Sequence, residues 1–185
     1  VGLPELPAER KTRYSNEGLD SDLAGVLSGS PAEIRDIYEV ATAEGADRRR
    51  AANWLTGEVT AWLRRTETHP TKLSLDGPQL AELVRIVGEG LVSSSAAKEV
   101  LEGVLLGEGS PRAVAKARDL VQISDTSALE KIVAGVLADN PEAVDRYAAG
   151  EQKVVGFLVG QVMKASQGKA DPKLVNQLLR QKLSS

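Results

Sequence analysis

Helix start and stop signals follow one another at short intervals along this chain and leave little room for other secondary structure. Proline after a capping residue opens several segments, as in Asp76-Gly77-Pro78, Asn140-Pro141 and Asp171-Pro172. Glycine closes others, as at Gly45 and Gly168. Because proline suits the first turn of a helix and glycine suits the position just past its end, this alternation predicts a series of short helices. Strand signals are few.

Caps and apolar spacing together predict where the individual helices lie. Ser30-Pro31-Ala32-Glu33 fits a capping box with Ser30 as the cap, while Ser124-Asp125 and Asn140 are expected to cap later helices. The expected helices run from Pro7, from Pro31 to Gly45, from Asp47 to about Arg65, from Asp76, from Ser93–Ser95 to Leu106, after Pro111, from Ser124-Asp125, from Asn140 to about Gly150, over 151–167 and from Asp171.

The strongest break in this pattern is Gly107-Glu108-Gly109-Ser110-Pro111. We therefore predict an all-α, multihelical fold with a larger helical bundle over residues 1–120 and a small tail of three to four helices over residues 121–185. No repeat of fixed length is visible, which argues against a solenoid. With 185 residues the chain can bury a core without help from disulfides or metal.

Residues with catalytic potential are sparse. The chain has no cysteine, which excludes disulfides and thiolate metal sites and suits a reducing, cytoplasmic location. His69 is the only histidine, and no glycine-rich phosphate loop leads into a helix. No apolar run approaches the roughly 18 residues of a membrane helix. We therefore predict no catalytic residue, no metal site, no cofactor within this chain and no membrane partner.

Charge is distributed unevenly along the chain. Residues 150–185 have a net charge of +4, although the whole chain has a net charge of -3. A basic end on an acidic body indicates an anionic partner, but cations also favour helix C-termini for structural reasons. Arg48-Arg49-Arg50 leaves a similar choice between phosphate contact and a charged first turn. Trp54 and Trp62 are interpreted as buried anchors rather than base-stacking platforms.

The segment 151–171 is the most informative part of the chain. At about 100° per residue, its apolar side chains cover one broad side of a helix: Val154, Val155, Leu158, Val159, Val162 and Met163. Gly156 and Gly160 fall on the opposite side, with Lys153, Phe157, Gln161 and Lys164. Two glycines inside a helix cost about 1 kcal/mol each relative to alanine, so something is expected to approach closely there. A neighbouring helix and a sugar-phosphate backbone both remain possible. Phe157 is expected to pack beneath the last helix rather than stack on a base.

Several motifs resemble one family in the same order along the chain. The most specific is Gly156-Phe157-Leu158-Val159-Gly160-Gln161-Val162-Met163-Lys164, followed by Gly168-Lys169-Ala170. Supporting motifs are Leu3-Pro4-Glu5-Leu6-Pro7, Ala51-Ala52-Asn53-Trp54-Leu55, Ala97-Lys98-Glu99-Val100, Gln122-Ile123-Ser124-Asp125 and Asn140-Pro141-Glu142-Ala143-Val144. Together they resemble the B subunit of the aspartyl/glutamyl-tRNA amidotransferases, the GatB/YqeY family, in its C-terminal helical and tail region.

The resemblance implies a function that composition does not show. Such a protein helps convert Glu-tRNA(Gln) and Asp-tRNA(Asn) to Gln-tRNA and Asn-tRNA, and it uses ATP and Mg in a catalytic domain absent here. We therefore expect this chain, which begins at Val1, to be a non-catalytic piece of a longer protein. The implied partners are tRNA(Gln) or tRNA(Asn) and the amidase and small subunits of the complex, with no DNA.

The resemblance also implies which residues touch RNA. The positions that match the family's tail motif are Lys153, Gly156, Gly160, Gln161, Lys164 and Lys169. Glu151, Gln167 and Asp171 depart from the family by making the tail less positive, which leaves the number of phosphate contacts open, and we expect weak binding by this chain alone. The alternative function is a helical protein–protein interaction module within this or another complex.

Overall fold

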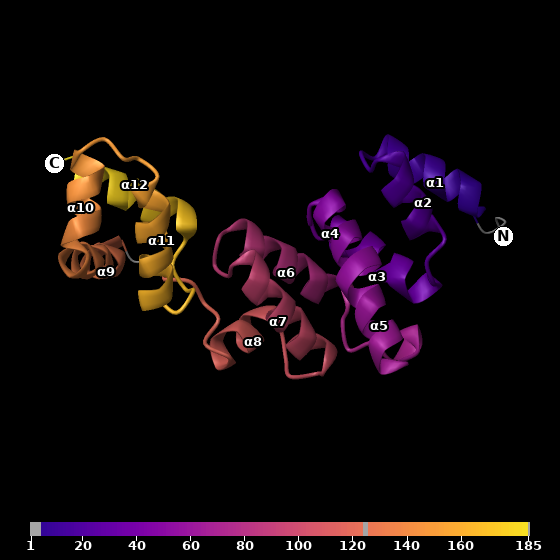
Figure 1. The fold of residues 1–185 in the computed structure, drawn as a ribbon. Coiled ribbons are helices and arrows are strands. Elements are labelled where there is room, and N and C mark those ends of the chain that lie inside the picture. The colour runs from indigo at the N-terminus through magenta and orange to yellow at the C-terminus, as the bar shows by residue number, and fades with distance from the viewer. Residues whose placement is uncertain (1–4, 124–125, 185) are drawn as a thin grey trace. The chain divides into compact units, whose positions relative to one another are not determined.

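Helices account for the regular structure in this computed structural model, which describes residues 5–123 and 126–184 (Figure 1). Within those residues the only β pairing is an isolated bridge between Ile123 and Ala170, so the all-α prediction is confirmed. The expected cap at Ser124-Asp125 lies outside the described residues. None of the described helices combines the length and the apolar character that crossing a membrane requires.

The chain forms two compact units, each of which is described by itself. Unit 1 contains the chain up to Glu89 together with Ser94–Arg118. Unit 2 contains Gly90–Ser93 and the chain from Asp119 onward. The short segment belongs to unit 2 because the backbone N–H of Gln122 donates to the carbonyl of Leu91 at 2.7 Å. Leu91 and Gln122 are far apart in the sequence, so no local pattern indicated that they pair. The predicted division at residue 120 therefore did not assign Gly90–Ser93 to the second unit.

Unit 1 consists of short helices joined by tight turns. They are α1 (Pro7–Asn16), α2 (Ser21–Ser28), α3 (Ala32–Ala43), α4 (Arg48–Trp54), the π-helical turn η1 (Leu55–Val59), α5 (Thr60–Thr66), the 3₁₀ turn η2 (Pro70–Lys72), α6 (Gly77–Gly88), α7 (Ser94–Leu105) and α8 (Pro111–Ala117). Helix α6 packs closely on α3. A side chain at Gly77 would place its Cβ 2.4 Å from the Cβ of Val40, so only glycine fits this contact without a shift of the helices.

Aspartate caps follow the prediction, but two other expected caps are wrong. The side chains of Asp47, Asp76 and Asp171 each accept a hydrogen bond from a backbone N–H in the first turn of their helices. Ser30 instead donates through Oγ to the carbonyl of Val26, and α3 begins without a capping box. Asn140 donates through Nδ2 to the carbonyl of Val136. Both side chains bond back to the preceding helix, which is a local alternative open to serine and asparagine.

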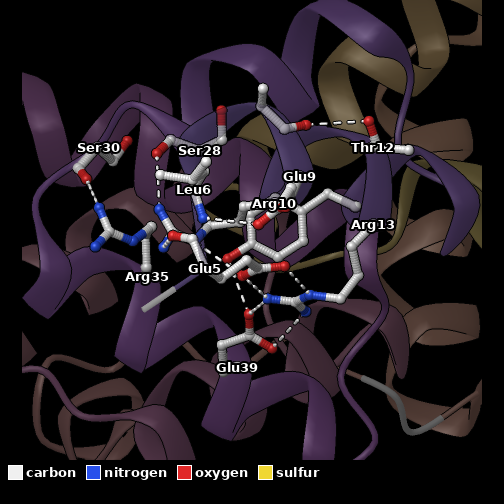
Figure 2. A network of polar contacts seen from close by, with 12 residues as sticks. Glu5, Leu6, Glu9, Arg10, Thr12, Arg13, Ser28, Ser30, Arg35 and Glu39 are labelled. Atoms are coloured by element: carbon white, nitrogen blue, oxygen red, sulfur yellow. Dashed lines mark hydrogen bonds and ion pairs between the residues drawn. The ribbon is translucent and has the colours of Figure 1, made fainter. Parts of the chain in front are cut away.

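A network of charged side chains joins α1 to α3 (Figure 2). Arg13 lies between two carboxylates, 2.9 Å from Glu5 and 2.8 Å from Glu39. The hydrogen bond from Arg13 lowers the pKa of Glu5. The hydroxyl of Tyr14 donates to Glu39 at 2.9 Å, and burial together with this bond raises the pKa of Tyr14. Tyr38 packs edge-on against Tyr14, with 5.2 Å between the ring centroids.

The two tyrosines provide a matched pair of variants for this network. Tyr14→Phe removes a hydrogen bond to a partly exposed carboxylate and is expected to lower the free energy of unfolding by about 1 kcal/mol. Tyr38→Phe removes a buried hydroxyl that makes no hydrogen bond of normal geometry among the described residues, although the Arg48 side chain lies near it, so it is expected to lower stability less than Tyr14→Phe does. Urea denaturation of both variants measures the difference. Equal losses would contradict the hydrogen-bond assignment.

Unit 2 contains four helices within the described residues. They are α9 (Thr126–Asp139), α10 (Pro141–Ala148), α11 (Val154–Ala165) and α12 (Pro172–Leu183). Their inward side chains form one apolar core with Ala170, and the fully buried members of this core are Leu129, Val133, Leu158, Val162, Ala170, Val175 and Leu179. Helix α11 packs against α9, α10 and α12, so one of its faces is committed to the core.

Candidate functional site

Helix α11 has two faces of opposite character. Val154, Val155, Leu158 and Val162 are buried on the inner face, as the apolar spacing predicted. Val159 and Met163 lie at its margin and are only partly buried. The burial of these side chains fixes the rotation of the helix, and this rotation directs the remaining positions outward.

The outward face of α11 is a smooth strip centred on two glycines. Gly156 and Gly160 are both exposed, and a Cβ added to either would meet nothing within 4 Å. Gln161 beside them is half-buried. Of the two partners that the sequence left open, a neighbouring helix does not cover these glycines within the described residues of unit 2. The strip is therefore open to a partner that could approach the helix backbone closely.

Lysines stand at both ends of this strip. Lys153 occupies the N-cap position of α11 and Lys164 lies in its last turn, and both side chains are exposed. At 1.5 Å per residue the two positions are separated by about 16 Å along the helix axis. An extended anion could therefore contact both cations while it lies across the glycines. This geometry suits a polyanion better than a single small anion.

Lys169 lies in the turn after α11 and has a carboxylate partner within the same unit. Its ammonium group forms an ion pair with Asp119, whose side chain is largely exposed. The backbone N–H of Ile123 donates to the carbonyl of Lys169 at 2.7 Å, which holds the turn beside the start of unit 2. An exposed ion pair contributes about 0–1 kcal/mol, so a phosphate could displace Asp119. Lys169 remains a candidate contact, in competition with this carboxylate.

The prediction that Phe157 packs beneath the last helix is wrong. Phe157 is 51% exposed and lies outside the core that the four helices of unit 2 form. The helical wheel already placed it on the side of the glycines, and that signal outweighs the general preference of phenylalanine for burial. The correction adds an aromatic ring to the outward surface of α11.

Beside Phe157 the surface is hollowed. The hollow has a volume of about 470 Å³ and is lined by Asp139, Asn140, Pro141, Glu142, Ala143, Arg146, Glu151, Lys153, Val154 and Phe157. Arg146 donates two hydrogen bonds to Glu151, at 2.8 and 2.7 Å, and this lowers the pKa of the Glu151 carboxyl. The positive charge of Arg146 and the negative charge of Glu151 therefore neutralise each other. No sequence pattern indicated this hollow, because it forms only where α10 meets α11.

Other candidates from the sequence have structural roles. Arg48 pairs with Glu17 at 2.6 Å and Arg49 with Asp20 at 2.9 Å, which explains both without a phosphate. Trp62 is buried, as expected of an anchor, and Trp54 is half-buried. His69 lies in a loop, and its Nδ1 is 2.9 Å from the hydroxyl of Thr71. Across residues 5–123 and 126–184, no cluster of histidine, aspartate and glutamate side chains could hold a metal ion.

Comparisons with known proteins give a consistent result. Residues 36–183 match the model of the GatB domain. The B subunit of the aspartyl/glutamyl-tRNA(Asn/Gln) amidotransferase of a Picosynechococcus species is 45% identical over 98% of the chain. The B subunits of the same enzyme of Thermosynechococcus vestitus and Latilactobacillus sakei are 43% and 39% identical, again over 98% of the chain. The chain spans 37%, 36% and 38% of the lengths of these relatives.

Proposed function

The chain belongs to the GatB domain family, and from this premise we propose that it is the tRNA-holding C-terminal part of an amidotransferase B subunit. The observation that carries the proposal is the open glycine strip of α11 with a lysine at each end. On an exposed helix face that contacts nothing else, these glycines only weaken the helix. Their use is explained if a sugar-phosphate backbone lies against them.

In the proposed binding mode the chain positions the tRNA and does no chemistry. Lys153 and Lys164 neutralise phosphates, Lys169 adds a contact when it leaves Asp119, and Gln161 can donate to or accept from the sugar. Gly156 and Gly160 let the backbone of the RNA approach. Phosphate contacts fix the orientation of the RNA, while selectivity comes from the shape of the folded tRNA.

The remaining roles belong to the longer protein. Relatives that carry this region are named for aspartyl/glutamyl-tRNA(Asn/Gln) amidotransferase activity. We propose that the parent protein acts with an amidase subunit and a small subunit on tRNA(Gln) or tRNA(Asn) in the cytoplasm. ATP and Mg would be bound by a catalytic domain outside this chain, and the present residues would supply no cofactor ligand.

Protein docking is the second candidate function, and one surface of unit 1 favours it. Leu106 is 59% exposed. Near it in sequence, Leu101 and Leu105 of α7 line a shallow groove with Trp62 of α5. Charged side chains surround these three, among them Glu58, Arg65, Lys98 and Glu102, so the groove would suit a partner that presents apolar and charged groups together. The two functions use different units and are compatible with each other.

Binding of labelled tRNA at several salt concentrations tests the proposal. The double variant Lys164→Ala, Lys169→Ala is expected to weaken binding and to reduce the slope of log affinity against log salt by about 1.4 to 1.8, the share of two phosphate contacts. The melting temperature is expected to change little, because neither side chain is in the core.

The matched control removes the same charge from unit 1. Lys72 and Lys116 are both exposed there, and their double alanine variant is expected to bind tRNA with the parent's salt slope. If the Lys164 and Lys169 variant binds as well as the parent, the assignment of these contacts is wrong. If the parent chain does not bind tRNA at low salt, the proposed function itself is contradicted.

A further inference from the structure

We propose that the hollow beside Phe157 binds one unpaired guanine base of the RNA. This inference rests on the RNA-binding function proposed above and names a ligand chemistry that the glycine strip does not supply. The hollow opens on the same helix as the strip, since Lys153, Val154 and Phe157 of its lining are contributed by α11 and the residue before it. An RNA strand that crosses the strip therefore passes the mouth of the hollow.

Phe157 provides a stacking surface. Among the described residues of unit 2 it is the only large hydrophobic side chain that is strongly exposed, since the others, Leu6, Val26, Val40 and Leu106, lie in unit 1. Aromatic side chains bind unpaired bases by stacking, and this contact does not depend on the sequence of the RNA. Ala143 and Val154 extend the apolar lining, and a volume of about 470 Å³ is within the range of small-molecule sites.

The polar lining selects among the bases. Asp139 and Glu142 contribute carboxylates, which accept hydrogen bonds and donate none when ionised. One N–H of the Asn140 Nδ2 donates to the carbonyl of Val136, so Asn140 keeps its Oδ1 as an acceptor and one further N–H as a donor. Guanine presents the N1–H and N2–H donors side by side on its Watson–Crick edge and so matches a carboxylate. Uracil presents one donor between two carbonyls, and cytosine and adenine each present an acceptor beside one amine.

The same charges exclude other occupants. A phosphate in the hollow would meet Asp139 and Glu142, whereas Lys153 can hold the phosphate next to a bound guanine. An apolar protein segment would take the two carboxylates out of water without providing a donor, which is costly. Arg146 and Glu151 form an ion pair with each other and line one part of the hollow. A base with donors on its edge satisfies both the ring and the carboxylates, and the RNA strand that crosses the strip would bring such a base to the hollow.

A direct test uses the fact that Phe157 is the only phenylalanine in the chain. Incorporation of 4-fluorophenylalanine gives a single ¹⁹F resonance that reports on this ring alone. The probe is an octamer of uridines with one central guanosine, compared with octamers that carry inosine or adenosine there. The guanosine octamer is expected to shift the resonance and to bind at least about fivefold more tightly than the others, because inosine lacks the N2 amine.

Variants separate stacking from charge. With a labelled guanosine octamer, Phe157→Ala is expected to weaken binding about five- to hundredfold with an unchanged salt slope, while Phe157→Trp restores it. Lys153→Ala is expected to reduce the slope by about 0.7. Glu142→Gln combined with Asp139→Asn is expected to remove the preference for guanosine over inosine while stacking persists.

The outcomes distinguish this inference from the function on which it rests. If tRNA binds but no octamer moves the resonance, the guanine site is overturned and the tRNA-holding function stands. Equal shifts by all three octamers overturn guanine selectivity. If the guanosine octamer shifts the resonance but the chain does not bind tRNA, the guanine site stands and the tRNA-holding function is overturned. Failure of both measurements overturns both.

Discussion

Replacing Gly160 by leucine is expected to weaken tRNA binding about tenfold or more while it stabilises helix α11. Leucine favours a helix over glycine by about 0.8 kcal/mol, and a Cβ at this position meets no atom of the chain within 4 Å. The side chain would therefore project from the strip and keep the phosphate backbone away from the helix. Loss of the contacts beside Lys164 accounts for a tenfold change, which corresponds to about 1.4 kcal/mol.

Two variants control for this change. Gly160→Ala adds a single carbon and is expected to give most of the stabilisation with a smaller loss of binding. Gly135 in α9 is also exposed and also has nothing within 4 Å of an added Cβ, so Gly135→Leu reproduces the gain in helix propensity on another helix. Binding is measured by titration of labelled tRNA and stability by thermal melts. Tight binding by Gly160→Leu would show that the strip does not face the RNA.

Replacing Leu158 by alanine is expected to destabilise unit 2 by about 2–5 kcal/mol. Leu158 is fully buried at the centre of a core formed by four short helices. A unit of this size has a total stability of only several kcal/mol, at about 0.05–0.15 kcal/mol per residue, so a large fraction of the variant would have unit 2 unfolded. Binding of tRNA through α11 would fall with the folded fraction.

Hydrogen exchange resolved by residue measures this effect and locates it. Amides of α9 to α12 are expected to exchange faster in Leu158→Ala, whereas those of α3 and α6 in unit 1 keep their protection. Val159→Ala is the control, since Val159 is on the same helix but only partly buried, and it is expected to cost about half as much or less. Equal losses in both variants would contradict the placement of Leu158 at the centre of the core.

Local chemistry explains what the sequence predicted correctly. Aspartate caps such as Asp76 depend on residues three positions away, and the inward face of α11 depends on helical spacing around Leu158. Both features depend on residues only a few positions apart, so they can be predicted without a structure. The glycine strip follows from the same spacing. The RNA contacts of the strip stay a prediction.

Features that depend on distant residues were missed. Lys169 pairs with Asp119, which lies 50 positions earlier, and no local pattern indicates that partner. The hollow requires α10 and α11 to meet, so Phe157 had no visible neighbours in the sequence. Ser30 and Asn140 were expected to cap the helix ahead of them, but each bonds to the helix behind. Competition between two local hydrogen bonds of similar energy cannot be decided from residue type alone.

The π-helical turn of unit 1 has a consequence for the length of its segment. Ala51, Leu55, Val59 and Leu63 are all buried, although four-residue steps in a regular helix rotate by about 40° each and would carry them off one face. The wider turn over Leu55–Val59 winds less per residue and takes up this drift. One residue inserted or deleted here would turn Trp62 and Leu63 away from the core by about 100°. Related chains can therefore vary in the type of residue between Ala51 and Leu63, but the number of residues between these two positions is constrained.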